Sequence, residues 1–182
     1  KTVADAVQYA HQRGVLHRDL KPANVIIDVA DQPRITDFGL ARRIEGLSEL
    51  TASGQVLGTP SYMSPEQASG NLAAVGPAGD VYSLGATLYE LLCGRPPFRG
   101  ETAVATLKHV LEEEPVPPRR LNPAIPRDLD VISTRCLQKE PSRRWQSMAD
   151  LSAVLRDLRE DSESSRTRGP AAHAAARQSR VW

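Results

Sequence analysis

Four polar residues in the first part of the sequence have the types and spacing needed to move a phosphoryl group. Asp19, Lys21 and Asn24 lie within six residues of one another, and Asp37 follows them. Phosphoryl transfer needs a carboxylate for the proton of the attacking hydroxyl, oxygen ligands for magnesium and a cation on the moving phosphate. These three types are present, and the carboxylate of Asp37 is a hard oxygen ligand that suits Mg²⁺. The spacing therefore indicates phosphoryl transfer as the candidate chemistry.

Asp37 can reach Asn24 only if the chain between them folds back. Val25–Ile27 is a short β-branched run that predicts a strand, and a second strand is predicted near Arg34–Thr36. The turn region between them, at residues 28–33, makes the two strands antiparallel. Such a hairpin brings its far end back beside its beginning, so we expect the two polar side chains to be neighbours.

A helix is expected to precede this hairpin. Val3, Val7 and Ala10 recur at helical spacing and predict an amphipathic helix that ends near Arg13, with Gly14 as its C-cap.

The rest of the chain is predicted to be mostly helical. Ser64 is expected to cap a helix that begins at Pro65. The most apolar helix is expected over Asp80–Cys93 and ends before Gly94. The remaining predicted elements are loops at residues 41–58 and 71–79 and helices near Glu101–Glu113, Arg127–Gln138 and Ser147–Asp161.

Composition and charge argue against several classes of protein. No apolar run approaches the roughly 18 residues that a membrane-spanning helix needs. From residue 164 onward there are four arginines and no acidic residue, so the rest of the chain is mildly acidic and does not suggest nucleic-acid binding. Cys93 and Cys136 lie far apart and predict buried, reduced thiols in a cytoplasmic protein.

Three short motifs together resemble a known family. Asp19-x-Lys21-x-x-Asn24, Asp37–Phe38–Gly39 and Ser64–Pro65–Glu66 stand in the order and spacing of the protein kinase signature set. The sequence is similar to bacterial, eukaryotic-like serine/threonine protein kinases from residue 1 to about residue 158. The resemblance implies a protein kinase-like (α+β) C-terminal lobe over residues 1–160, mostly α-helical with short β-hairpins at the catalytic cleft. A disordered or juxtamembrane-like linker is expected over residues 161–182.

The resemblance implies roles for the residues of the reaction. Asp19 would be the catalytic base, Lys21 would contact the transferred phosphate, and Asn24 and Asp37 would hold the magnesium ions. Thr59 would lie in the loop that receives the substrate and would hydrogen-bond toward the catalytic loop. Thr59 and Lys21 both favour serine or threonine as the residue that accepts the phosphate.

The implied cofactors are ATP and Mg²⁺. Ile26 would lie under the adenine ring, with Thr36 near the edge of the pocket. The full set of implied ATP-contacting residues is Lys21, Ala23, Asn24, Ile26, Thr36 and Asp37.

Other matching residues are expected to be structural. His17 would be a packing and backbone anchor, with the ring of Phe38 against it. Asp80 would be a buried acid that accepts hydrogen bonds from the backbone of the catalytic loop. Glu66 and Arg144 would form a buried ion pair that fastens the substrate loop to the helices.

Regulation is expected in the segment after Asp37. Arg18 precedes the catalytic base, an arrangement in which an arginine pairs with a phosphorylated loop. Thr51 and Ser53 best match the autophosphorylated residues of the family. Alternatively, both are ordinary solvated loop residues.

A complete kinase also needs a Gly-rich loop over the phosphates and a strand lysine paired with a helix glutamate. Neither lies in the 18 residues before Asp19, so we expect this chain to be a C-terminal lobe whose N-lobe is absent, and to be inactive alone. Protein substrates, ATP, the missing N-lobe and a second kinase molecule are the expected partners, with no nucleic acid. The full-length protein is expected to be cytoplasmic, with a possible membrane anchor after residue 182. Two alternatives are a kinase-like scaffold that binds partners through Glu101–Arg120 and a kinase of small molecules.

Overall fold

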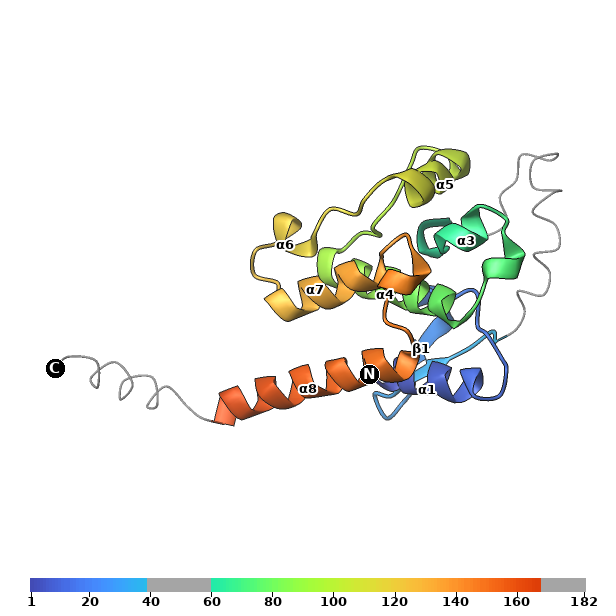
Figure 1. Cartoon of the computed structure of the whole chain (residues 1–182). Helices are drawn as coiled ribbons and strands as arrows, with labels where there is room; N and C mark the ends of the chain where they lie inside the picture. The colour runs from blue at the N-terminus through green and yellow to red at the C-terminus, as the bar shows by residue number, and fades with distance from the viewer. Residues whose placement is uncertain (39–59, 168–182) are drawn as a thin grey trace.

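The computed structural model describes residues 1–38 and 60–167 of the chain. In Figure 1, helix α4 runs through the middle with α7 beside it, while α1 and α8 lie together on one side and α3 and α5 on the other. Among the described residues the elements are α1 (Thr2–His11), η1 (Pro22–Asn24), β1 (Val25–Ile27), β2 (Pro33–Ile35), η3 (Pro60–Tyr62), α3 (Pro65–Ala68), η4 (Leu72–Ala74), α4 (Pro77–Cys93), α5 (Ala103–Glu112), α6 (Pro118–Leu121), α7 (Arg127–Cys136), η5 (Pro141–Arg143) and α8 (Met148–Thr167).

The predicted hairpin is present. Strands β1 and β2 pair antiparallel in the register Val25↔Ile35, Ile26↔Arg34 and Ile27↔Pro33. The turn between them is fastened by Asp28, whose carboxylate accepts the Ala30 N–H at 2.8 Å. The observed fold is therefore the mostly helical lobe with a short β-hairpin that the sequence predicts.

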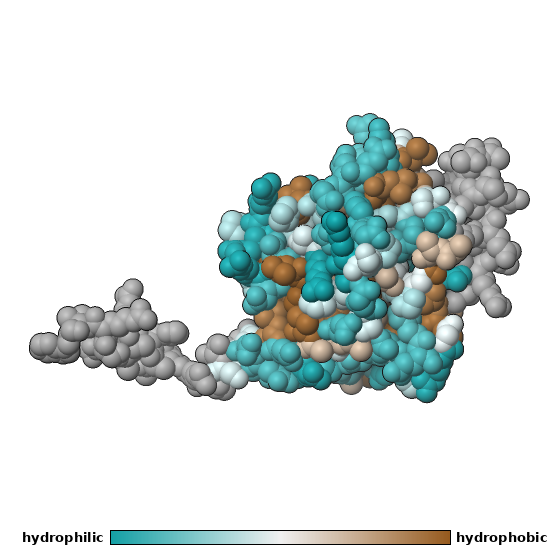
Figure 2. Space-filling model, in the orientation of Figure 1, coloured by the Kyte–Doolittle hydropathy of each residue, from teal (hydrophilic) through white to brown (hydrophobic). Residues whose placement is uncertain are grey.

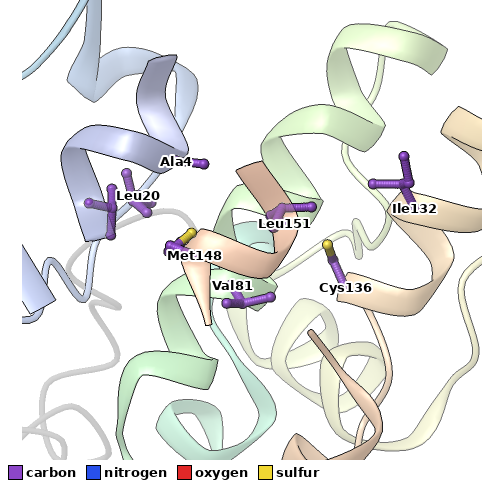
Figure 3. Close-up of a cluster of buried hydrophobic side chains, with 8 residues drawn as sticks. Ala4, Leu20, Val81, Ile132, Cys136, Met148 and Leu151 are labelled. Atoms are coloured by element: carbon purple, nitrogen blue, oxygen red, sulfur yellow. The ribbon is translucent and has the colours of Figure 1, made fainter. Parts of the chain in front are cut away.

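One hydrophobic cluster joins the expected catalytic loop, residues 17–24, to four helices. Leu20, which follows Asp19 directly, is buried with Val81 of α4 and with Met148 and Leu151 of α8. Helices α1 and α7 complete this cluster, part of which is drawn in Figure 3. Burying a leucine side chain stabilises a fold by about 1.5–3 kcal/mol, so the loop is fixed to the helices by packing as well as by hydrogen bonds.

A second cluster lies on another face of α4. Tyr82 and Tyr89 of α4 are buried there with Phe98, Val110 of α5 and Leu137. Helix α4 thus contributes buried side chains to both clusters, which explains why it is the most apolar helix of the chain.

Several helix ends differ from the sequence prediction. Helix α4 begins at Pro77, because Gly76 is extended at the N-cap and proline fits the first helical position. Helix α8 begins after Ser147 as predicted, and the Ser147 hydroxyl accepts the Asp150 N–H at 3.1 Å. Its end was predicted too early.

Helix α8 continues to Thr167 and so crosses the expected boundary at residue 160. Arg159 and Glu163 form an i,i+4 ion pair of 3.3 Å in the last part of α8, and no glycine or proline occurs between Ser147 and Gly169. The single turn α6, with Pro118 at its first position, was not predicted.

Polar and apolar side chains are mixed on the face of the molecule drawn in Figure 2. In Figure 2 the lower edge of the molecule, where α8 lies in Figure 1, is mostly hydrophilic. None of the helices within the described residues is both long enough and apolar enough to cross a membrane.

Candidate active site

The carboxylate of Asp19 is held in place by two neighbouring side chains. Lys21 Nζ lies 2.8 Å from Asp19 Oδ2, and Asn24 Nδ2 donates to the same oxygen at 3.0 Å and to the Asp19 carbonyl at 2.8 Å. The side chain of Asp19 is 47% exposed, so a hydroxyl from solvent or from a substrate can reach it. The structure therefore brings the predicted carboxylate, cation and amide together in one cluster.

The hairpin returns Asp37 to this cluster, as antiparallel pairing predicts. The Thr36 N–H donates to the Asn24 carbonyl at 3.0 Å, so the residue before Asp37 is bonded to the residue before β1. Asp37 itself has a φ of 63°, which is uncommon for a residue with a side chain, and its carboxylate is exposed.

The oxygens of this cluster fit a magnesium ion. Asn24 directs its amide nitrogen at Asp19, so the carbonyl oxygen of the same amide faces away from that carboxylate. With Asp37 it offers two hard oxygen ligands, and Mg²⁺ is commonly bound by one or two side chains plus phosphates and water. Among the described residues, no group of three or more His, Cys, Asp or Glu could hold a metal ion.

The residues expected at the nucleotide lie on the hairpin and beside it. Ile26 is 53% exposed in the middle of β1, and Ala23 is exposed in η1. The Thr36 hydroxyl donates to the Asn24 carbonyl at 3.4 Å, which places Thr36 next to the proposed magnesium ligands. An exposed apolar side chain beside polar oxygens suits a ligand with a flat base and a charged phosphate chain.

His17 is enclosed between the loop and the hairpin. Its ring is fully buried, and the Asp19 N–H donates to its Nδ1 at 3.3 Å. Nε2 therefore carries the proton and donates to the Thr36 carbonyl at 2.9 Å. The ring of Phe38 lies 4.7 Å away between centroids. With both nitrogens engaged, this histidine ties the catalytic loop to the strand rather than facing a substrate.

Asp80 of α4 binds the backbone of the loop at His17 and Arg18. Its Oδ2 accepts the His17 N–H at 2.9 Å, and its Oδ1 accepts the Arg18 N–H at 2.7 Å. The side chain is only 2% exposed, so these charge-assisted bonds lie in a nearly dry environment.

Sequence reasoning missed a further partner of Asp80. His11 Nε2 lies 2.7 Å from Asp80 Oδ2. Ala4, Val7 and His11 fall on one helical stripe of α1, and the first two are fully buried. A histidine in a buried stripe needs a hydrogen-bond partner, and this was the available signal.

Arg18 has an unusual backbone that depends on these contacts. Its φ is 66°, a conformation that costs of order 1–3 kcal/mol and persists only where surrounding contacts enforce it. Gln67 of α3, a second residue that sequence reasoning missed, donates from Nε2 to the Arg18 carbonyl at 2.8 Å. Within the described part of the chain, Arg18 Nε is buried without a hydrogen-bond partner.

Glu66 and Arg144 form a buried ion pair behind α3. Arg144 donates to Glu66 Oε1 and Oε2, at 2.8 Å each. Burial acts to raise the pKa of Glu66, but the hydrogen bonds and charge of Arg144 outweigh it, so the pKa lies below its ordinary value. Helix α3 is thereby fixed to the end of η5.

Tyr62 and Glu90 form another contact that sequence reasoning missed. The Tyr62 hydroxyl donates to Glu90 Oε2, and burial together with this carboxylate raises the pKa of the tyrosine. Tyr62 lies in η3, three residues after Thr59 of the expected substrate loop, so α4 supports the chain next to that loop.

Four predicted residues lie outside the residues that the structure describes. They are Gly39 of the Asp37 motif, the expected phosphorylation sites Thr51 and Ser53, and Thr59 of the substrate loop.

Comparisons with known proteins agree with this geometry. Residues 1–154 match the family model of the protein kinase domain. The serine/threonine-protein kinase PknB of Mycobacterium leprae is 42% identical over 156 residues, which cover 84% of this chain and 25% of that protein. The DNA damage-responsive serine/threonine-protein kinase RqkA of Deinococcus radiodurans is 45% identical over 166 residues, which cover 90% of this chain and 24% of that protein.

The chain thus spans about a quarter of the length of these curated relatives. The match covers residues 17–24, the hairpin and the helices that hold them. The chain belongs to the protein kinase domain family, and its relatives include serine/threonine kinases of bacteria.

Proposed function

We propose that the protein containing this chain transfers the γ-phosphate of ATP to serine and threonine hydroxyls of other proteins, in signal transduction. The observation that carries this proposal is the Asp19 carboxylate, bonded by Lys21 at 2.8 Å and by Asn24 at 3.0 Å, with Asp37 returned beside them by the hairpin. A binding module has no need of this arrangement, because the exposed carboxylate and the metal ligands serve only the reaction.

Each residue then has a chemical task. Asp19 orients the acceptor hydroxyl and takes its proton, while Lys21 stabilises the negative charge of the moving phosphate. Asn24 and Asp37 hold magnesium, which neutralises the phosphate oxygens of bound ATP. Because the protein forms no covalent intermediate in such a transfer, positioning and charge supply the catalysis.

The acceptor class follows from the family and from two residues. Lys21 lies between Asp19 and Asn24 in the sequence. Thr59 follows in the loop that is expected to receive the substrate. Both are typical of kinases that act on serine and threonine, and the relatives carry that activity in their names.

A second lobe is part of the proposal. Ile26, Ile27 and Val29 of the hairpin region are 53%, 60% and 109% exposed, which is costly for apolar side chains in water. We place the N-lobe, with its Gly-rich loop and strand lysine, over these residues. Without it, this chain alone binds ATP poorly and transfers phosphate negligibly.

The proposal extends to location and regulation. The reaction takes place in the cytoplasm, where ATP is available, and the arginines after residue 164 are typical of a segment that precedes a membrane anchor. The buried Nε of Arg18 supports pairing with a phosphate on Thr51 or Ser53, and a second kinase molecule would add it. Mass spectrometry of active protein tests this step, and the absence of phosphate on both residues contradicts it.

The activity is tested with the full-length encoded protein, ATP, Mg²⁺ and a generic protein substrate such as casein. Phosphoserine and phosphothreonine are expected as products, and Asp19→Asn is expected to abolish their formation. The same assay with this chain alone is expected to give no product. An active chain, or a full-length protein unaffected by Asp19→Asn, contradicts the proposal.

A scaffold without catalysis is the second candidate. Val104 and Leu111 of α5 are 69% and 39% exposed, which favours a partner on this helix. The genomic sequence upstream of Lys1 separates the two candidates: a reading frame with a Gly-rich loop and a strand lysine supports the kinase, and a start codon at this position supports the scaffold.

A further inference from the structure

Gln67 uses the two ends of its amide for two different purposes. Its Oε1 accepts the Ser64 N–H at 3.2 Å and lies 3.0 Å from the Ser64 hydroxyl, which caps the start of α3. Its Nε2 points the other way and donates to the Arg18 carbonyl at 2.8 Å, 49 residues earlier in the chain. The side chain is 3% exposed, so water does not replace either contact.

The carbonyl that Gln67 binds belongs to the peptide that joins Arg18 to Asp19. The N–H of that same peptide donates to His17 Nδ1 at 3.3 Å. In this loop Asp80 binds the two preceding peptides instead, through the His17 and Arg18 N–H groups. Gln67 and His17 therefore determine the orientation of the peptide from which the Asp19 side chain extends.

The backbone at Gln67 is itself held in place. The adjacent residue Glu66 is held by two bonds of 2.8 Å from Arg144, which is fully buried. A positive φ at Arg18 leaves the following peptide dependent on external contacts, and this contact comes from a rigid part of the molecule.

We propose that Gln67 is a positioning residue for catalysis, which couples the start of α3 to the orientation of the Asp19 carboxylate. The inference rests on the proposed kinase activity. It adds a residue outside the reacting groups whose amide donor sets the geometry of the base.

Two variants separate the capping end from the positioning end. Gln67→Glu keeps an acceptor for Ser64 and adds a negative charge near the helix N-terminus, where it is favourable, but it has no hydrogen to donate to the Arg18 carbonyl. Ser64→Ala is the matched control, because it removes the hydroxyl that meets Oε1 and leaves the Nε2 contact intact.

Kinetics of the full-length protein provide the first measurement. Gln67→Glu is expected to lower kcat by about 10- to 100-fold with the KM for ATP nearly unchanged, because the base is displaced and the nucleotide is not. Ser64→Ala is expected to stay within about twofold of the unmodified protein in both constants. A kcat of Gln67→Glu within that range overturns the inference.

Hydrogen exchange followed by mass spectrometry provides the second measurement and does not depend on activity. In Gln67→Glu, faster exchange is expected in the peptide covering residues 17–24, with α4 and α7 unchanged. Unchanged exchange in this peptide, or faster exchange throughout the molecule, overturns the inference. If the unmodified protein shows no transfer, the proposed function fails, and exchange alone still decides whether Gln67 holds the loop.

Discussion

The guanidinium of Arg144 and the carboxylate of Glu66 face each other across 78 residues of sequence, with two hydrogen bonds of 2.8 Å between them. Arg144 is fully buried, and its remaining donors reach the carbonyls of Ala78, Gln138 and Lys139 at 2.8–2.9 Å. One side chain thus connects α3, the start of α4 and the loop before η5. Arg144 thus holds α3 in its position against these segments.

Breaking this pair is expected to destabilise the fold strongly. Glu66→Gln leaves a buried guanidinium without its counter-charge, and loss of one partner from a buried pair costs about 3–5 kcal/mol. Arg144→Met is expected to cost at least as much, because three carbonyls also lose their donor. Free energies of unfolding from denaturant titration give both values. Arg143→Met, at the exposed neighbouring position, is the control and is expected to change stability by less than about 0.5 kcal/mol.

The same pair predicts acid sensitivity. The pKa of Glu66 in the folded protein lies below its ordinary value of 4.5, so the unfolded state binds its proton more readily. Its contribution to stability is complete above pH 4.5 and is lost as the pH falls through the lower folded pKa.

Unfolding titrations between pH 7 and pH 3 measure this contribution. The unmodified protein is expected to lose stability more steeply than Glu66→Gln in the acid part of this range, since other carboxylates are common to both. If the stability of the two proteins changes with pH in parallel, the pKa of Glu66 is not lowered in the folded protein.

Short-range features of this fold could be predicted from the sequence. The β1–β2 hairpin and the caps at Ser64 and Ser147 depend on residues a few positions apart, and all three are present. Helix α8 was predicted too short because the pattern of apolar residues ends before the helix does. Its last turns are maintained by helix-forming polar residues and the pair between Arg159 and Glu163.

Contacts between distant segments could not be predicted from local pattern. His11 reaches Asp80 across 69 residues, and Gln67 reaches Arg18 across 49. No spacing rule connects such positions, because the packing of α1, α3 and α4 decides which side chains meet. Asp80 was expected only because the sequence resembles a family, whereas His11 and Gln67 had no such support.

Asp80→Asn is expected to impair catalysis more than stability. An asparagine can accept one of the two backbone N–H groups of His17 and Arg18, but its own NH₂ faces the other. The strained conformation of Arg18 then loses a contact that enforces it, and kcat of the full-length protein is expected to fall by about 10-fold or more. Asp157→Asn, 69% exposed on α8, is the matched control and is expected to leave kcat unchanged. Equal kcat values for the two variants contradict this role for Asp80.

The close approach of α4 to α7 gives a prediction about packing alone. A Cβ atom added at Gly85 would lie 2.2 Å from the Cβ of Cys136, well inside the van der Waals limit, and Cys136 is fully buried. Gly85→Ala must therefore push the two helices apart and is expected to destabilise the protein by about 1–3 kcal/mol, although alanine is the better helix former.

The double variant Gly85→Ala with Cys136→Gly tests the cause. Removing the cysteine side chain removes the colliding atom, so the double variant is expected to be more stable than the sum of the two single changes predicts. Thermal unfolding of the four proteins gives the coupling. Additive effects show that the two residues do not collide, because only a shared contact makes one substitution compensate for the other.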